Sequence, residues 1–179
     1  MKFLSDLRLL LTALWLGAAI FFIGVAQSSF AVLPTRELAG SVVGRTLMIL
    51  NISGVVIGLI LLVSSLLVQK GSNRILLWTE RILLVIVTAA CAVGQFVIAL
   101  WLQFTRAQMG KPVDELAADD PLRVQFNSLH MYSEWVLMAG MLAALLAFFI
   151  MANRRVGPAS TSTATTNDPF DFSKEFKKT

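Results

Sequence analysis

The sequence predicts an all-α integral membrane protein, built as an antiparallel bundle of four transmembrane helices with a disordered C-terminal tail. Hydrophobic residues make up 56% of the 179 residues, and the mean hydropathy is +0.74. A water-soluble domain of this length could not hide so much apolar surface in one core. Four windows also lack any charged side chain, and each has the roughly 19 to 25 residues that a helix needs to cross a bilayer. They are residues 9–33, 46–69, 82–105 and 135–153.

The first helix is predicted over about residues 7–33. Lys2 and Arg8, placed before an apolar run, imitate a secretory signal. The apolar region of such a signal has about 7 to 15 residues, whereas this run has about 25. We therefore expect a retained transmembrane helix that Pro34 ends.

The second and third helices are predicted at about 45–69 and 76–105, joined by the short polar turn 70–74. Glu80 and Arg81, near the start of the third helix, are interpreted as an anchor pair at the membrane surface. The single cysteine, Cys91, lies in the middle of this helix, so we expect a small buried residue and no disulfide framework.

The fourth helix is predicted over 121–153, longer than its charge-free window. Asp120 followed by Pro121 is a favourable helix start, with Asp as the N-cap and Pro at the first helical position.

Pairs of small residues at four-residue spacing occur in three of the helices. Such pairs let helix backbones approach closely in lipid. We interpret them as packing inside the bundle, with a homodimer interface as the alternative. The pairs are Gly54 and Gly58, Ala90 and Gly94, and Gly140 and Ala144.

Four consecutive spans place both termini on the same side of the membrane as the turn 70–74. Seven basic residues lie near that side, against five near the other. The positive-inside rule then favours cytoplasmic termini in a multi-pass protein of the plasma (inner) membrane.

We assign residues 1–155 to the membrane domain. Residues 156–179 have too little apolar surface to fold alone and are predicted to form a disordered cytoplasmic tail.

Polar residues gather at the opposite ends of the helices. On the fourth helix, Asn127, His130 and Glu134 follow at steps of three and four, which puts them on one face, and Ser133 lies beside them. Ionisable residues within a membrane usually face a bundle interior or a wet cavity. The resulting hypothesis is a polar cup for a ligand, an ion or a proton path. Its candidate residues are Arg45, Asn51, Gln95, Asn127, His130, Ser133 and Glu134.

A structural interpretation of the same residues stays open. Arg123 and His130 could lie among lipid headgroups, and Glu134 could pair with His130 or Arg45 so that the polar groups at the helix ends have partners. His130 with Met131 or Met138 offers imidazole and thioether groups, but one histidine is little for a metal or haem site, and methionines commonly serve as packing. We therefore predict no metal, no cofactor and no catalytic residue.

Two stretches of the chain resemble a known family. One is LWLGAAIFFIGVAQSSFAVLPTRELAGSVVGR at residues 14–45, and the other is DDPLRVQFNSLHMYSEW at residues 119–135. The chain resembles the bacterial membrane family of domain of unknown function 4149, also called transmembrane-protein-205-like, over about residues 7–152. This resemblance implies a four-helix membrane protein with no assigned activity. It places Arg45, Phe126, Asn127, Leu129, His130 and Ser133 at motif positions, whereas Glu134 and Trp135 depart from the family's pattern.

The sequence favours a non-enzymatic accessory or scaffold protein within a larger membrane complex, because four helices with short loops leave little soluble surface. The alternative is a small-solute, proton or metal-ion transporter that uses the polar cup around His130. An enzyme that acts on a membrane lipid or a redox carrier comes third. Besides the lipid bilayer, we expect a membrane-protein partner or a homo-oligomer, and no nucleic acid.

Overall fold

The computed structural model describes residues 2–67 and 74–153, and all the long elements in these ranges are helices. Four of its segments are long and apolar enough to cross a membrane. The predicted four-helix membrane architecture is confirmed, while the predicted tail lies outside the described residues. The elements are α1 (Lys2–Val32), α2 (Arg36–Leu67), α3 (Arg74–Val93), the π-helix η1 (Gly94–Ile98), α4 (Ala99–Met109), the 3-10 helix η2 (Val113–Glu115) and α5 (Pro121–Asn153).

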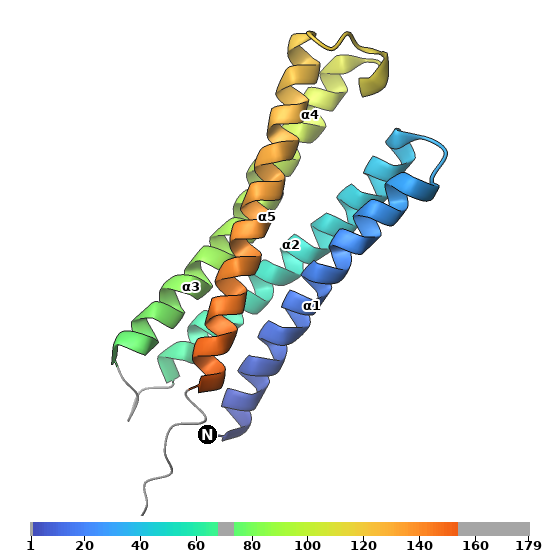
Figure 1. Cartoon of the computed structure of the whole chain (residues 1–179). Coiled ribbons are helices and arrows are strands. Elements are labelled where there is room, and N and C mark those ends of the chain that lie inside the picture. Colours follow the sequence, from blue (N-terminus) through green and yellow to red (C-terminus); the bar gives the residue numbers. More distant parts are fainter. Residues whose placement is uncertain (1, 68–73, 154–179) are drawn as a thin grey trace, which may run out of the picture.

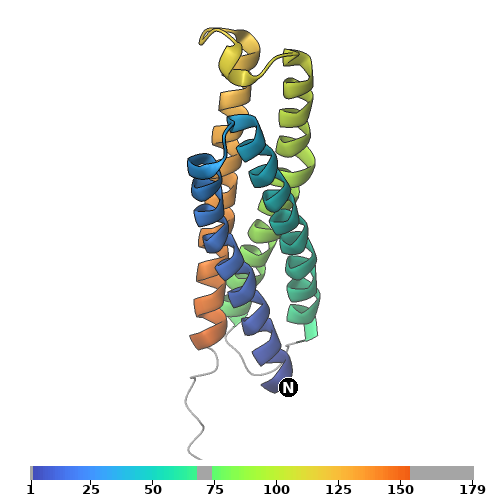
Figure 2. The same cartoon turned by 90° about the vertical axis from the view of Figure 1, so that its right-hand side faces the viewer.

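The helices run alternately up and down, and α3, η1 and α4 form one continuous rod (Figure 1). We call the end that holds the N-terminus the lower end and the end that holds the α1–α2 turn the upper end. Both α1 and α3 pack against α2 and α5, which closes the lower half into a ring of four helices. In the upper half α4 packs mainly on α5, and this pair diverges from the α1–α2 hairpin (Figure 1), which lies in front of the pair in Figure 2.

Exposed aromatic residues mark where the bundle meets the two membrane surfaces. Trp78 is exposed near the lower end, and Trp101, Tyr132 and Trp135 are exposed toward the upper end. Trp and Tyr concentrate at membrane–water interfaces because their rings are apolar with one polar group. We therefore place the hydrocarbon core between these two levels.

Each span is longer than this core is thick. The spans have 30 to 36 residues, or about 45 to 54 Å at about 1.5 Å per residue, whereas a core of about 30 Å takes only about 20 residues. Counting about 20 residues up from Asn153 places the upper boundary near Glu134. The first part of α5, together with the start of α2 and the end of α4, therefore extends beyond the hydrocarbon. We call these segments, residues 36–45 and 102–134, the upper head.

The helix starts show how the charge-free windows differ from the helices themselves. The second helix was predicted from about residue 45, whereas α2 begins at Arg36, where the Thr35 hydroxyl accepts a hydrogen bond from the Leu38 amide at 3.2 Å. A charge ends the hydrocarbon-crossing part of a helix but does not end the helix. At α5, Asp120 accepts a hydrogen bond from the Leu122 amide at 2.8 Å, the N-cap contact expected of the Asp-Pro pair.

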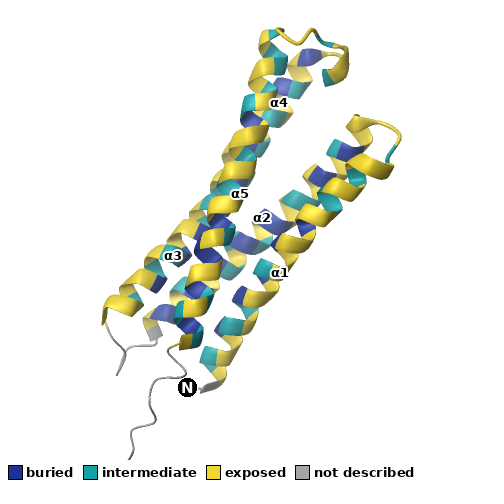
Figure 3. Cartoon of the chain, in the orientation of Figure 1, coloured by how far each residue is buried: buried dark blue, intermediate teal, exposed yellow. Residues whose placement is uncertain are grey.

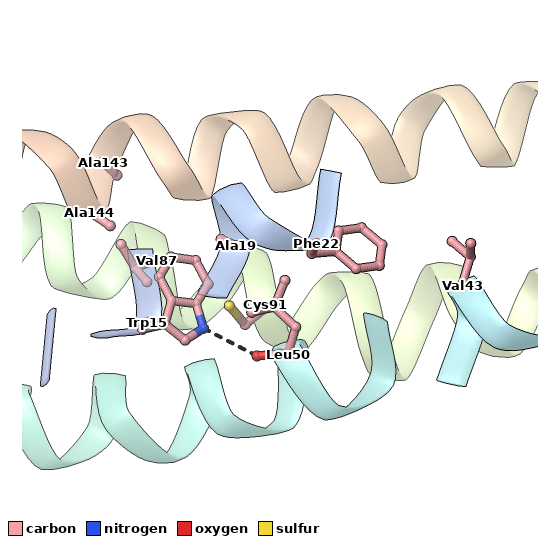
Figure 4. Packing of buried hydrophobic residues seen from close by; sticks show 9 residues of the cluster. All are labelled: Trp15, Ala19, Phe22, Val43, Leu50, Val87, Cys91, Ala143 and Ala144. Carbon is pink, nitrogen blue, oxygen red and sulfur yellow. Dashed lines mark hydrogen bonds between the residues drawn. The ribbon is translucent and has the colours of Figure 1, made fainter. Parts of the chain in front are cut away.

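Small residues on the inner faces allow the helices to approach closely. A Cβ built at Gly54 would lie 2.5 Å from Cys91 Sγ and 2.6 Å from Trp15 Nε1. Trp15 lies in the main hydrophobic cluster, where its indole donates a hydrogen bond to the Leu50 carbonyl at 3.2 Å (Figure 4). Buried residues follow these inner faces (Figure 3). The interpretation of Gly54, in the pair with Gly58, as a contact inside the bundle is confirmed.

Candidate functional site

Two charged side chains are buried inside the lower end of the bundle. Arg8 of α1 is 3% exposed and Glu80 of α3 is 0% exposed, and the two form an ion pair. The neighbouring Arg81 donates a hydrogen bond to the Ser65 carbonyl of α2 at 3.0 Å. Charges withdrawn from water are tolerated only when they are paired. The Arg8–Glu80 pair therefore connects α1 and α3 inside the ring.

The interpretation of Glu80 as part of a surface anchor is wrong, because its carboxylate lies in the interior. A pattern in the sequence could have revealed the pair. The first and third spans run in the same direction, and Arg8 and Glu80 both precede the charge-free window of their span. Opposite charges at the same depth of two parallel spans indicate a contact between those spans.

The structure divides the predicted polar cup into an outward and an inward group. Arg45, Asn127, His130 and Glu134 are exposed. His130 Nε2 lies 3.4 Å from Glu134 Oε1, with the two side chains 51% and 65% exposed. The Phe126 ring stacks on the His130 imidazole, with the ring centroids 6.5 Å apart. On α5, the outward group forms a stripe on the outer face in which Glu134 is paired to His130, and we call it the ionisable stripe; Arg45 is exposed separately on α2.

Asn51 and Ser133 form the inward group. Both line a small void between α1, α2, α5 and the α3–η1 rod, with Trp15 and Cys91 in its wall. The void measures about 10 Å³, enough for the centre of about one water molecule. Gln95, the remaining candidate residue, is half-buried on η1 and does not line this void.

Ion pairs connect the parts of the upper head. Arg106 of α4 contacts Glu37 of α2 at 2.9 Å, and Arg36 of α2 contacts Asp114 of η2 at 3.3 Å. These contacts join the two diverging hairpins at the upper end of the structure. Within the described ranges, no three His, Cys, Asp or Glu side chains come together in a way that could hold a metal ion.

Comparison with known proteins places the chain in a family. No curated protein and no solved structure matches it. A family model described as Domain of unknown function (DUF4149) matches residues 10–111, more than half of the chain. This range contains the resembling stretch 14–45 and ends before the stretch 119–135, so the motif positions on α5 rest on the sequence resemblance alone. The helices and this match together identify a multi-pass membrane protein that belongs to the DUF4149 family.

Proposed function

We propose that this protein is a non-enzymatic accessory or scaffold subunit that binds a partner membrane protein on the outer face of α5. The observation that carries this proposal is the orientation of the ionisable stripe. His130 and Glu134 point away from the bundle on a helix whose next residues, toward Asn153, are apolar. Side chains that face outward at the membrane surface are available to a neighbouring protein.

The surroundings of the stripe support a protein partner. Met131, Trp135 and Met138 are exposed on the outer side of α5, near the stripe. Aromatic residues and methionine are enriched in protein interfaces, and Trp and Tyr are frequent among the residues that contribute most binding energy. A partner helix that offers polar groups at the headgroup level and apolar groups below it would complement this face.

The interior of the bundle also supports a scaffold role. The Arg8–Glu80 pair and the close contact of Gly54 with Trp15 and Cys91 connect α1, α2 and α3. Packed interiors of this kind resist deformation. Because α5 packs against α3 and α1, the bundle holds α5 as a fixed surface.

The proposal includes an orientation in the plasma (inner) membrane with cytoplasmic termini, supported by the basic residues at the lower end. The upper head then lies outside the cytoplasm. A membrane-impermeant maleimide added to intact cells is expected to react with the exposed Ala117→Cys in a Cys91→Ala background. Reaction only after the membrane has been permeabilised would contradict this orientation.

The docking face is tested by the double variant His130→Ala with Glu134→Gln. Native mass spectrometry of gently extracted protein is expected to show at least about tenfold less retained partner, the size of effect typical of a residue that matters to an interface. Gln103→Ala with Gln108→Ala, on exposed positions of α4, is the matched control and should retain the partner.

Two results would contradict the docking role. If the double variant keeps its partner but melts at a lower temperature, the stripe serves the stability of α5 alone. If His130→Ala abolishes a proton or solute flux through the protein while the partner stays bound, the transporter alternative is favoured.

A further inference from the structure

The void lined by Asn51 and Ser133 contains two polar side chains without a partner. Asn51 is 4% exposed, yet its side-chain amide makes no hydrogen bond to any described residue. The Ser133 hydroxyl has no hydrogen-bond partner in the described ranges either. Other serines on these two helices do have one, since Ser53 donates to the Leu50 carbonyl and Ser128 to the Val124 carbonyl.

These two side chains come from helices on different sides of the void. Asn51 belongs to α2 and Ser133 to α5, and both line the same void of about 10 Å³. The described residues do not enclose the polar atoms of the Asn51 side chain completely, so these atoms keep some accessible surface. A buried amide without a hydrogen bond is costly, and native structures usually supply a partner from protein, water or ligand.

The third wall of the void is the π-helix η1. Its first residue, Gly94, is buried, and a Cβ at this position would lie 3.1 Å from Asn51 Nδ2. Glycine therefore leaves the amide of Asn51 unobstructed. Single-turn π-helices within α-helices are rare and occur frequently at functional sites.

We infer that Asn51 and Ser133 form a binding site for one uncharged oxygen group, a hydroxyl or a carbonyl. Among the described residues, no charged side chain lines the void, so an ion would find no counter-charge there. An amide and a hydroxyl can each donate and accept a hydrogen bond, which suits a neutral oxygen. The rest of the wall is apolar and includes Trp15, Leu47 and Leu137.

Two sources could supply this oxygen at the depth of Asn51. This residue lies six positions below Arg45, or about 9 Å along α2. It lines the void together with Ser133, the residue directly before Glu134, so the void lies at the level of the upper boundary of the hydrocarbon. One source is a single water molecule. The other is the polar end of an uncharged lipid-soluble molecule. Both sources present a neutral oxygen to Asn51 and Ser133, and an experiment distinguishes between them.

The experiment uses dioctanoylglycerol as the probe and native mass spectrometry of the purified full chain. A lipid source predicts a one-to-one adduct that is lost in Asn51→Leu and in the milder Ser133→Ala. Ser53→Ala and Ser128→Ala are the matched controls, because their hydroxyls already have backbone partners. Both controls should keep the adduct.

A second measurement covers the water source. Nuclear magnetic resonance of protein with ¹⁵N-labelled asparagine would show magnetisation transfer from water to the side-chain amide of Asn51, assigned by its loss in Asn51→Leu. A bound water is identified if magnetisation transfer from water to the Asn51 amide weakens in Ser133→Ala and no specific dioctanoylglycerol adduct forms. The inference is overturned if the probe binds equally to all variants or not at all and the Asn51 amide receives no transfer from water.

Discussion

Glu80→Leu is expected to destabilise the folded bundle by about 3–5 kcal/mol, because it leaves the guanidinium of Arg8 buried without its counter-charge. The native carboxylate is 0% exposed and pairs directly with Arg8, which also approaches the Leu61 carbonyl at 3.5 Å. Equilibrium unfolding in mixtures of dodecylmaltoside and sodium dodecyl sulfate measures this free energy. We expect a large shift of the unfolding midpoint toward lower sodium dodecyl sulfate.

Two controls separate the buried charge from the loss of a side chain. Arg8→Met combined with Glu80→Leu removes both charges, and such replacements of buried pairs are often neutral or stabilising. Arg36→Met breaks the exposed pair with Asp114, and pairs of this kind contribute only about 0–1 kcal/mol. If the double variant is as unstable as Glu80→Leu, then lost packing, and not the unpaired charge of Arg8, causes the decrease in stability.

Gly54→Ala is expected to destabilise the bundle by about 1–3 kcal/mol, the range for an added group in a filled interior. The new methyl group would fall 2.5 Å from Cys91 Sγ and 2.6 Å from Trp15 Nε1. Either α2 moves away from α1 and α3, or Trp15 gives up its hydrogen bond to the Leu50 carbonyl. The same unfolding measurement reports the loss of stability, and the fluorescence of Trp15, with Trp78, Trp101 and Trp135 replaced by Phe, reports the change around its indole.

Gly44→Ala on the same helix is the matched control. No atom of residues 2–67 and 74–153 lies within 4 Å of a Cβ built at Gly44, so alanine meets no neighbour there and reduces backbone freedom in the unfolded chain. This variant should be neutral or more stable by up to about 1 kcal/mol. Equal destabilisation by both substitutions would mean that α2 does not pack against α1 and α3 at Gly54.

The helix count could be predicted from the sequence because transfer into hydrocarbon penalises every charge within a span. This energy depends on local composition and needs no tertiary contact. The start of α5 could be predicted for a similar reason, since the cap of Asp120 and the fixed backbone of Pro121 act within one turn. The start of α2 could not, because Arg36 and Glu37 extend the helix in the aqueous phase, where charge costs little.

The candidate site was only half predictable. Helical spacing shows that Asn127, His130 and Glu134 share a face, but it does not say which way that face points. The direction depends on the opposite side of α5, where Leu129 and Gly140 are buried against neighbouring helices. The pairing of Arg8 with Glu80 depends likewise on the packing of α1 beside α3, which only the tertiary structure shows.

The position of the ionisable stripe at the membrane surface is tested most directly by thiol labelling along α5. Single cysteines replace Gln125, Met131, Met138 and Leu142, all exposed, in a Cys91→Ala background. The purified protein in lipid nanodiscs is treated with a charged maleimide, and labelling is normalised to Ala117→Cys.

We predict strong labelling at Gln125→Cys and Met131→Cys and weak labelling at Met138→Cys and Leu142→Cys, with the boundary near Glu134. Protection that already begins at Gln125 would place His130 and Glu134 inside the hydrocarbon and contradict a docking face at the membrane surface.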